Sequence, residues 1–251
     1  VTPTAAIPLY GRSADNIRDH RHVTSLLHRI ETTDIGILVT PTLSFDERGH
    51  QVNHMTYYCV GWSGNGEKPV DFYPTAEDFV GEGGNFERPY AIVKKAEGVK
   101  AGTRIEGLEA VGGLHFSEVT LEPEEECSYL IFTGITEDIQ EIRNLSKTYT
   151  TREMVLEELE KTKAYWQEKV NVAYHTGDSD FNQFMHWVSF QPILRRIYGC
   201  SFLPHHDYGK GGRGWRDLWQ DCLALLIMNP DGVRQMLLDN FAGVRVDGSN
   251  A

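Results

Sequence analysis

Residues 35–62, IGILVTPTLSFDERGHQVNHMTYYCVGW, decide the fold of the first half of the chain. β-Branched and aromatic residues dominate residues 35–45 and 52–62, and such residues favour extended strands. The polar residues 46–49, DERG, lie between the two runs and are typical of a turn. The stretch therefore predicts a β-hairpin with a strand on each side of the turn.

Further short strands are predicted along the first half, at residues 90–94, 114–121 and 127–132. Turn-rich or acidic segments separate them. Several short strands with frequent turns indicate an antiparallel β-sandwich rather than a parallel sheet. Residues 16–29 show a helical pattern that is partial at best.

The hydrophobic period changes after Thr150, where apolar residues begin to recur at helical spacing. A long linker helix is predicted over residues 152–170, opened by the capping-box spacing of Thr150 and Glu153. Pro192 is expected to kink the next helix. The three helices predicted after the linker are residues 181–198, 218–228 and 231–241.

Composition excludes several classes of protein. The chain has 251 residues and 40% hydrophobic content, enough for one large domain or two ordinary ones. Its net charge of −12 argues against nucleic acid as a partner, because a phosphate backbone requires a basic surface. The longest apolar run, residues 223–228, is too short to span a membrane, and the N-terminus lacks the pattern of a secretion signal.

The cysteines point to a reducing compartment. They lie far apart, without the spacing of a zinc site, and each is expected to behave as a small buried hydrophobic residue. We therefore expect a cytoplasmic protein. The four cysteines are Cys59, Cys127, Cys200 and Cys222.

Residues 209–221, GKGGRGWRDLWQD, carry the strongest functional signal. Four glycines allow close approach to a ligand, and aromatic rings beside carboxylates and guanidinium groups suit a sugar. The apolar helical pattern begins at Leu218, so the polar group is expected on a loop that enters a buried helix. The alternative is a glycine-rich loop closed by a structural Arg–Asp pair.

Taken in order, these segments resemble glycoside hydrolase family 94, the inverting disaccharide and oligosaccharide phosphorylases. The resemblance rests on residues 79–85, FVGEGGN, on residues 182–191, and above all on the Arg-Asp-x-x-Gln-Asp element at 216–221. Residues 4–16 and 45–50 are similar to the 1,2-β-oligoglucan phosphorylase branch.

The resemblance implies a multidomain fold, in which an antiparallel β-sandwich is followed by a linker helix and the start of an (α/α)6 barrel. The later part of the sandwich would occupy residues 1–148, the helical linker 149–174, and the opening helices of the catalytic barrel 175–251. The chain looks like a fragment, so the general acid, an aspartate, is expected after Ala251. No catalytic residue is assigned in this chain.

Such a fragment is expected to be inactive alone and prone to aggregate. An (α/α)6 barrel cut after a few helices would expose broad apolar faces, including those of Phe184, Trp187 and Leu225. The remainder of the barrel would come from downstream chain or from another polypeptide.

By the same resemblance, Arg216 and Asp217 would hold hydroxyls of the glucosyl unit at the cleaved end. Asp221 would either join them or brace Arg216. Trp215 or Trp219 could stack on the sugar, although Trp219 could equally face the helix core.

A basic residue shortly before the Arg-Asp pair faces phosphate in this family, and Lys210 and Arg213 both qualify. The alternative is a solvated basic loop. Gln191 is interpreted as a brace between helix and loop, whereas Glu82 and Asn85 of the sandwich could help to recognise the sugar chain.

Two further clusters are interpreted as structural. His205-His206-Asp207 is not expected to bind a metal, because adjacent side chains rarely point at one ion. Asp178 and Asp180 are expected to cap the helix that follows them. No metal and no cofactor are therefore expected.

The implied reaction is inverting phosphorolysis of β-linked gluco-oligosaccharides, with 1,2-β-glucans favoured, to α-glucose 1-phosphate and a shortened sugar. Inorganic phosphate would be the co-substrate, and the assembly could be a homodimer, with neither nucleic acid nor membrane as partner. The alternatives are a cellobiose-type phosphorylase, a hydrolase of the same fold, or a non-catalytic sugar-binding fragment.

Overall fold

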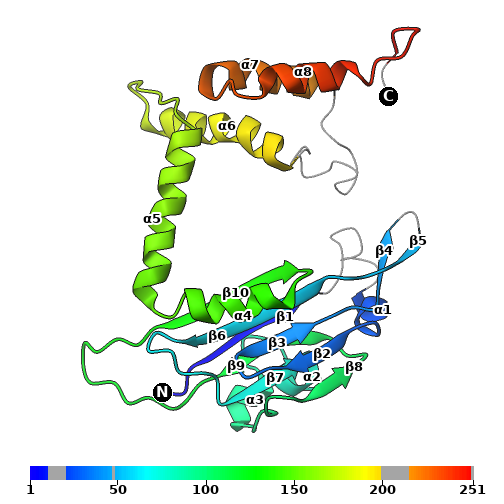
Figure 1. Cartoon of the computed structure of the whole chain (residues 1–251). Coiled ribbons are helices and arrows are strands. Elements are labelled where there is room, and N and C mark those ends of the chain that lie inside the picture. The colour runs from blue at the N-terminus through cyan, green and yellow to red at the C-terminus, as the bar shows by residue number, and fades with distance from the viewer. Residues whose placement is uncertain (11–20, 47–48, 199–214, 250–251) are drawn as a thin grey trace. The chain divides into compact units, whose positions relative to one another are not determined.

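Two units make up the chain, Val1–Leu156 and Glu157–Ala251, and the boundary between them falls within a long helix. This computed structural model describes residues 1–10, 21–46, 49–198 and 215–249. Strands and short helices build the first unit, and the described part of the second is helical (Figure 1). The proposed division at residues 148 and 174 remains a prediction.

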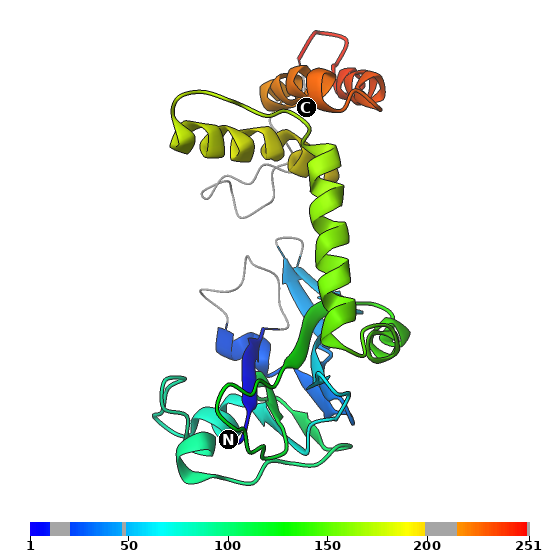
Figure 2. The same cartoon turned by 90° about the vertical axis from the view of Figure 1, so that its left-hand side faces the viewer.

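Antiparallel pairing joins the described strands of the first unit into two main sheets and a separate hairpin (Figure 2). The three-stranded sheet has the order β1 (Thr4–Leu9), β9 (Ala110–His115) and β7 (Asp71–Thr75). The five-stranded sheet has the order β10 (Tyr129–Thr136), β6 (Thr56–Ser63), β3 (Gly36–Val39), β2 (Arg29–Thr32) and β8 (Arg104–Glu106).

The predicted hairpin is present but divides into two pairs of strands. The tip is formed by β4 (Leu43–Asp46) and β5 (Gly49–Val52), with Asp46 opposite Gly49. At its base, β3 pairs with β6 inside the five-stranded sheet. The first predicted strand, 35–45, therefore covers β3 and most of β4, whereas the second, 52–62, overlaps β6 and meets β5 only at Val52.

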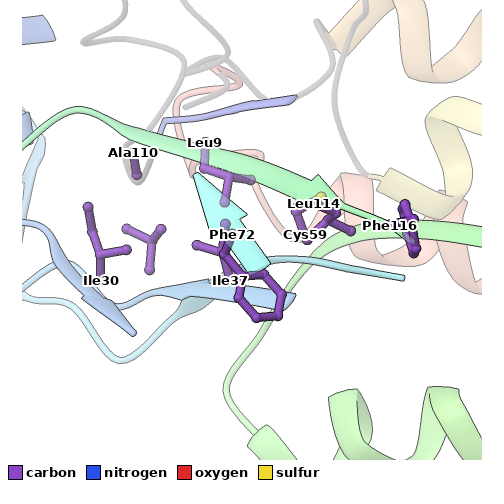
Figure 3. Packing of buried hydrophobic residues seen from close by; sticks show 9 residues of the cluster. Leu9, Ile30, Ile37, Cys59, Phe72, Ala110, Leu114 and Phe116 are labelled. Carbon is purple, nitrogen blue, oxygen red and sulfur yellow. The ribbon is translucent and has the colours of Figure 1, made fainter. Parts of the chain in front are cut away.

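The main core of the sandwich lies between the two sheets, and Figure 3 shows its side chains. Strand alternation places Ile37 and Val39 of β3 in this core, while Leu38 between them packs into a second cluster on the other face of the sheet. Burial on both faces explains why the sequence of β3 is continuously apolar. The labelled core residues are Leu9, Ile30, Ile37, Cys59, Phe72, Ala110, Leu114 and Phe116.

Helices cover the outer faces of both sheets. Helix α4 (Ile139–Thr148) packs Ile142 on the five-stranded sheet, and Trp62 Nε1 donates to the Tyr149 carbonyl over 2.8 Å. On the three-stranded sheet, Phe79 of α2 (Ala76–Val80) and Ala91 of α3 (Tyr90–Lys94) join a smaller cluster. The first unit thus has covered apolar surface on both sides of each main sheet.

Two local predictions for the first unit need correction, whereas the partial helix expected within residues 16–29 is present. Residues 90–94 form helix α3 rather than a strand, because Pro89 starts the helix and only Ala91 among them is buried. The strand predicted at 114–121 is β9, which ends at His115. Within residues 16–29, the described helix is α1 (Arg21–Ser25).

The second unit contains the helices predicted for it. The predicted linker helix is α5 (Arg152–Lys169), and α6 (Ser179–Tyr198) continues through Pro192. The last two helices are α7 (Trp215–Met228) and α8 (Val233–Phe241). Their shared core consists of Val170, Ile193, Cys222, Leu225, Met228 and Val233.

The cap of α5 differs from the prediction. The hydroxyl of Thr150 donates to Met154 Sδ over 3.2 Å. The pKa of Glu153 is lowered, first by a hydrogen bond from the backbone N–H of Glu153 itself and then by one from the Thr151 side chain. Because the helix begins at Arg152, Thr151 is the residue that precedes it, one position later than the predicted capping box.

Burial in the second unit only partly follows the prediction. Phe184 and Trp187 of α6 are 61% and 54% exposed, as expected for uncovered helix faces. Leu225 is fully buried because it packs into the shared core of α6, α7 and α8, so its predicted exposure was wrong. No helix in the described ranges is both long and apolar enough to cross a lipid bilayer.

The described cysteines differ in burial. Cys59 and Cys222 are buried, as predicted, and burial raises the pKa of the Cys59 thiol to about 12. Cys127 is exposed, which corrects the prediction for that residue. It lies in the segment between β9 and β10 rather than in a strand. Cys200 lies outside the described residues.

Candidate functional site

A cavity of about 420 Å³ lies between α6 and α7 in the second unit. The residues that α7 contributes recur every three or four positions, so one face of this helix lines the cavity. A face of α6 forms the other wall. The lining residues are Val172, Tyr174, Val188, Ser189, Gln191, Pro192, Arg195, Asp217, Gln220, Asp221, Ala224, Ile227 and Met228.

Two predicted site residues, Asp217 and Asp221, meet in this cavity. Asp217 was expected on a loop before the helix predicted at 218–228, but α7 already begins at Trp215, and a spacing of four residues brings both carboxylates to the same helix face. Arg216 is one position away and does not line the cavity. Its side chain is 84% exposed, with Nη2 3.6 Å from Asp217 Oδ1. Arg216 and Asp217 thus remain within ion-pair distance, but only Asp217 lines the cavity.

Asp221 is paired with Arg195 of α6, a residue that the sequence analysis did not single out. Arg195 Nε donates to Asp221 Oδ2 over 2.8 Å, and Nη2 donates to Oδ1. A third donor, Nη1, lies 3.1 Å from Gln191 Oε1. Asp221 is only 2% exposed. Its bracing contact is thus made with Arg195, and Gln191 braces the same guanidinium within its own helix.

The electrostatics of this pair keep Arg195 charged. Hydrogen bonding to Asp221 raises the pKa of Arg195, burial works against that rise, and the charges of Asp221 and Asp217 add to it. An ion pair with so little access to solvent is stable only when its hydrogen bonds are satisfied. The accessible carboxylate of the cavity is that of Asp217, whose side chain is 38% exposed and can accept hydrogen bonds from hydroxyl groups.

Trp215 and Trp219 take part in contacts with α8. Their rings meet edge to face at 5.4 Å, and Trp219 meets Phe241 at 5.0 Å. With its amide oxygen turned toward the indoles, Asn240 accepts from Trp215 Nε1 and Trp219 Nε1. Neither ring lines the described cavity. Both indoles thus have a structural role in contacts with α8, and sugar stacking by Trp215 remains a prediction.

Of the other predicted residues, some are not described and others have a structural role. Lys210 and Arg213 lie outside the described residues, as does the cluster at residues 205–207. Asp178 caps α6 as predicted, since its Oδ1 accepts from the backbone N–H groups of Asp180 and Phe181, whereas Asp180 lies within the first turn of the helix rather than before it. Within the described ranges, no group of acidic, histidine and cysteine side chains has the arrangement of a metal site.

The glycine-rich loop of the sandwich lines a separate, open cavity of about 730 Å³ in the first unit. Glu82, Asn85, Phe86 and Tyr10 are among its lining residues. Asn85 Oδ1 accepts from the backbone N–H groups of Glu87 and Arg88, so this side chain shapes the loop. A role in recognising a sugar chain remains a prediction for Glu82 and Asn85.

Arg195 could have been found from the sequence by its position. It lies four residues after Gln191, so both occupy one face of the helix predicted at 181–198. A charged side chain within that aromatic and aliphatic helix needs a buried partner. Nothing in the spacing, however, identifies Asp221 as that partner.

Comparison with known proteins now gives the family. Residues 13–152 match the family described as Glycosyl hydrolase 94, supersandwich domain. The chain belongs to glycosyl hydrolase family 94. The family 94 match covers most of the first unit, whereas the cavity of the second unit lies after it in the sequence.

A curated relative extends the similarity beyond the supersandwich domain. The chain is 27% identical over 203 residues to the cyclic beta-(1,2)-glucan synthase NdvB of Rhizobium meliloti (strain 1021). That match covers 76% of this family 94 chain and 6% of NdvB. The chain therefore spans only a small part of the length of this relative.

Proposed function

We propose that the full-length protein carries out inverting phosphorolysis of β-linked gluco-oligosaccharides, with 1,2-β-glucans favoured. The products would be α-glucose 1-phosphate and a shortened sugar. Family 94 membership supports a carbohydrate-active enzyme. The name of the relative NdvB, a cyclic beta-(1,2)-glucan synthase, supports the choice of linkage.

The observation that carries the proposal is the convergence of Asp217 and Asp221 with Arg195 in one cavity. Carboxylates held by a guanidinium group can accept hydrogen bonds from sugar hydroxyls. Such bonds strengthen as the ring approaches an oxocarbenium-like transition state and contribute several kcal/mol. We assign Asp217 to direct sugar contact and Asp221 to the bracing of Arg195, with Arg216 and Trp215 as further candidate sugar contacts.

The proposed reaction is a single displacement. A phosphate oxygen attacks the anomeric carbon as the glycosidic bond breaks, and a carboxylic acid protonates the departing oxygen. The β-linked sugar is thereby converted into the α-phosphate. The proposal places this acid outside these 251 residues, in the remainder of an (α/α)6 barrel that α6, α7 and α8 begin, and assigns Lys210 and Arg213 as candidate phosphate ligands.

An assay of the full-length protein tests the proposal. The protein is incubated with 1,2-β-gluco-oligosaccharides, with and without inorganic phosphate, and α-glucose 1-phosphate is measured. Product that requires phosphate is the expected result. Free glucose released without phosphate would indicate a hydrolase instead, and turnover of cellobiose alone would indicate another linkage. Sugar binding without turnover of any β-glucan would indicate a binding protein.

A further inference from the structure

Arg195 is held in one orientation on the α6 wall of the cavity. Asp221 accepts from two of its nitrogens, and Gln191 accepts from the third. Its side chain is 21% exposed, so the guanidinium still borders the cavity while its partner Asp221 is buried. A planar group fixed by three hydrogen bonds loses little further freedom when a ligand binds.

Among the residues that the structure describes, the charged side chains of the lining leave an excess of negative charge. Arg195 contributes one positive charge, and Asp217 and Asp221 contribute two negative charges, which gives a sum of −1. The charge of Asp217 also contributes to the raised pKa of Arg195, which is consistent with their sharing one electrostatic environment. An anion would meet net repulsion at this lining, whereas an uncharged ligand rich in hydroxyl groups would meet fixed acceptors.

We propose that Arg195 is the positioning residue of this cavity: its hydrogen bonds to Asp221 fix the face of α7 that presents Asp217, one turn earlier, to the hydroxyl groups of an uncharged sugar ring. The phosphate co-substrate is then bound by other residues. This inference rests on the proposed function and adds to it the residue that orients the proposed sugar contact, Asp217.

The neighbouring Arg196 provides a matched control on the same helix. Arg196 Nη1 donates to the carbonyls of Asn229 and Asp231, over 3.1 and 3.2 Å, where α7 ends. It does not line the cavity. Arg196→Met therefore removes an arginine that stabilises the helical unit without touching the candidate sugar contacts.

The test compares Asp217→Asn in two backgrounds of the full-length protein. One background is wild type, and the other is Arg195→Met/Asp221→Leu, which removes both buried charges. Removing both partners avoids the uncompensated charge that a single substitution would leave. Affinity for sophorose and for inorganic phosphate is measured by calorimetry, together with Tm, kcat and KM for phosphorolysis.

A positioning role predicts a specific pattern. The charge-free background keeps a Tm near that of wild type, yet binds sophorose about tenfold or more weakly, the size expected for lost hydrogen bonds to charged groups. Asp217→Asn weakens sophorose binding about tenfold in wild type but only about twofold in that background, because Arg195 acts through Asp217. Phosphate affinity stays unchanged, and Arg196→Met lowers Tm alone.

Several results would overturn the inference. If the charge-free background bound sophorose as tightly as wild type, the Arg195–Asp221 pair would have a purely structural role. Equal losses from Asp217→Asn in both backgrounds would show that Arg195 does not act through it. Weaker phosphate binding would move the anion into this cavity. Sophorose binding without phosphorolysis would contradict the proposed function alone, and no sophorose binding by wild type would contradict both.

Discussion

The two units of this chain cover their apolar surfaces in different ways. In the unit Val1–Leu156, each main sheet packs against the other sheet on one face and against a helix on the other. In the unit Glu157–Ala251, α6, α7 and α8 share one core, but large apolar side chains remain exposed on all three helices. The exposed residues include Phe181, Phe184, Trp187, Leu223, Leu226, Ile227, Leu238 and Phe241.

The unit with the better covered core is not the unit that contains the candidate site. The sandwich has the organisation of a self-sufficient domain, whereas the helical unit leaves large apolar side chains uncovered on α6, α7 and α8. The charged cavity with its buried ion pair nevertheless lies in the helical unit. Tolerance of substitution in the two units should therefore differ, and the predictions below test that difference.

The largest effect is expected from separating the units. Residues 1–156 expressed alone should unfold in one cooperative transition, because their core is covered on both sides. Residues 157–251 alone should bind the dye ANS and associate with increasing concentration, because their exposed apolar faces remain uncovered. Thermal unfolding and light scattering measure both. A monomeric, cooperative 157–251 fragment with low dye binding would refute the comparison.

The addition of a single methyl group in the sandwich should have the next largest effect on stability. A Cβ at Gly36 would lie 2.2 Å from the Cys59 carbonyl oxygen and 2.5 Å from Val60 Cα, both backbone atoms of the adjacent strand. Gly36→Ala should therefore lower the free energy of unfolding by about 3 kcal/mol. Denaturant titration measures the change.

Gly177→Ala is the matched control, because a Cβ there would have no atom within 4 Å. Its effect should stay within about 1 kcal/mol of zero. A Gly36→Ala variant as stable as this control would mean that β3 and β6 do not approach as closely as described.

These particular strands and helices also show how far the sequence predicts this molecule. The hairpin and the helices at 152–170 and 181–198 are confirmed because their patterns are long and regular. Residues 90–94 were predicted wrongly, since Tyr90, Ile92 and Val93 favour strands while the buried contact of Ala91 and the preceding proline determine a helix.

The candidate site was predicted only in part. The approach of Asp217 and Asp221 follows from helical periodicity once α7 begins at Trp215. The spacing of Gln191 and Arg195 indicates a shared helix face, but the pairing of Arg195 with Asp221, 26 residues away on another helix, leaves no local pattern. Contacts between helices, rather than the local motif, determine which charged groups line the cavity.

A smaller effect is expected from thiol labelling in the sandwich. Burial raises the pKa of Cys59 to about 12, so its thiolate is a small minority at pH 7 to 9 and its labelling should stay low across that range. Exposed Cys127 should react with iodoacetamide under the same conditions. Peptide mass spectrometry distinguishes the two residues. Equal labelling of both would indicate that the sandwich core opens readily.

The smallest effect is expected from an exposed ion pair. Lys68 Nζ pairs with Asp34 Oδ2, and their side chains are 57% and 66% exposed. Lys68→Met should change the free energy of unfolding by less than about 0.5 kcal/mol, because water screens such pairs. Arg195→Met, which leaves Asp221 buried without its partner, should cost about 3 kcal/mol or more. Similar losses from both substitutions in denaturant titrations would contradict the distinction.

The most direct test of the central claim is the phosphorolysis rate of Asp217→Asn in the full-length protein. Asp239→Asn is the control, because Asp239 lies on α8 and accepts only an exposed hydrogen bond from Gln235 among its described side-chain contacts. With 1,2-β-gluco-oligosaccharide and phosphate, kcat/KM should fall about 100-fold for Asp217→Asn and stay near wild type for the control. A wild-type kcat/KM in Asp217→Asn would show that the cavity between α6 and α7 is not the sugar site.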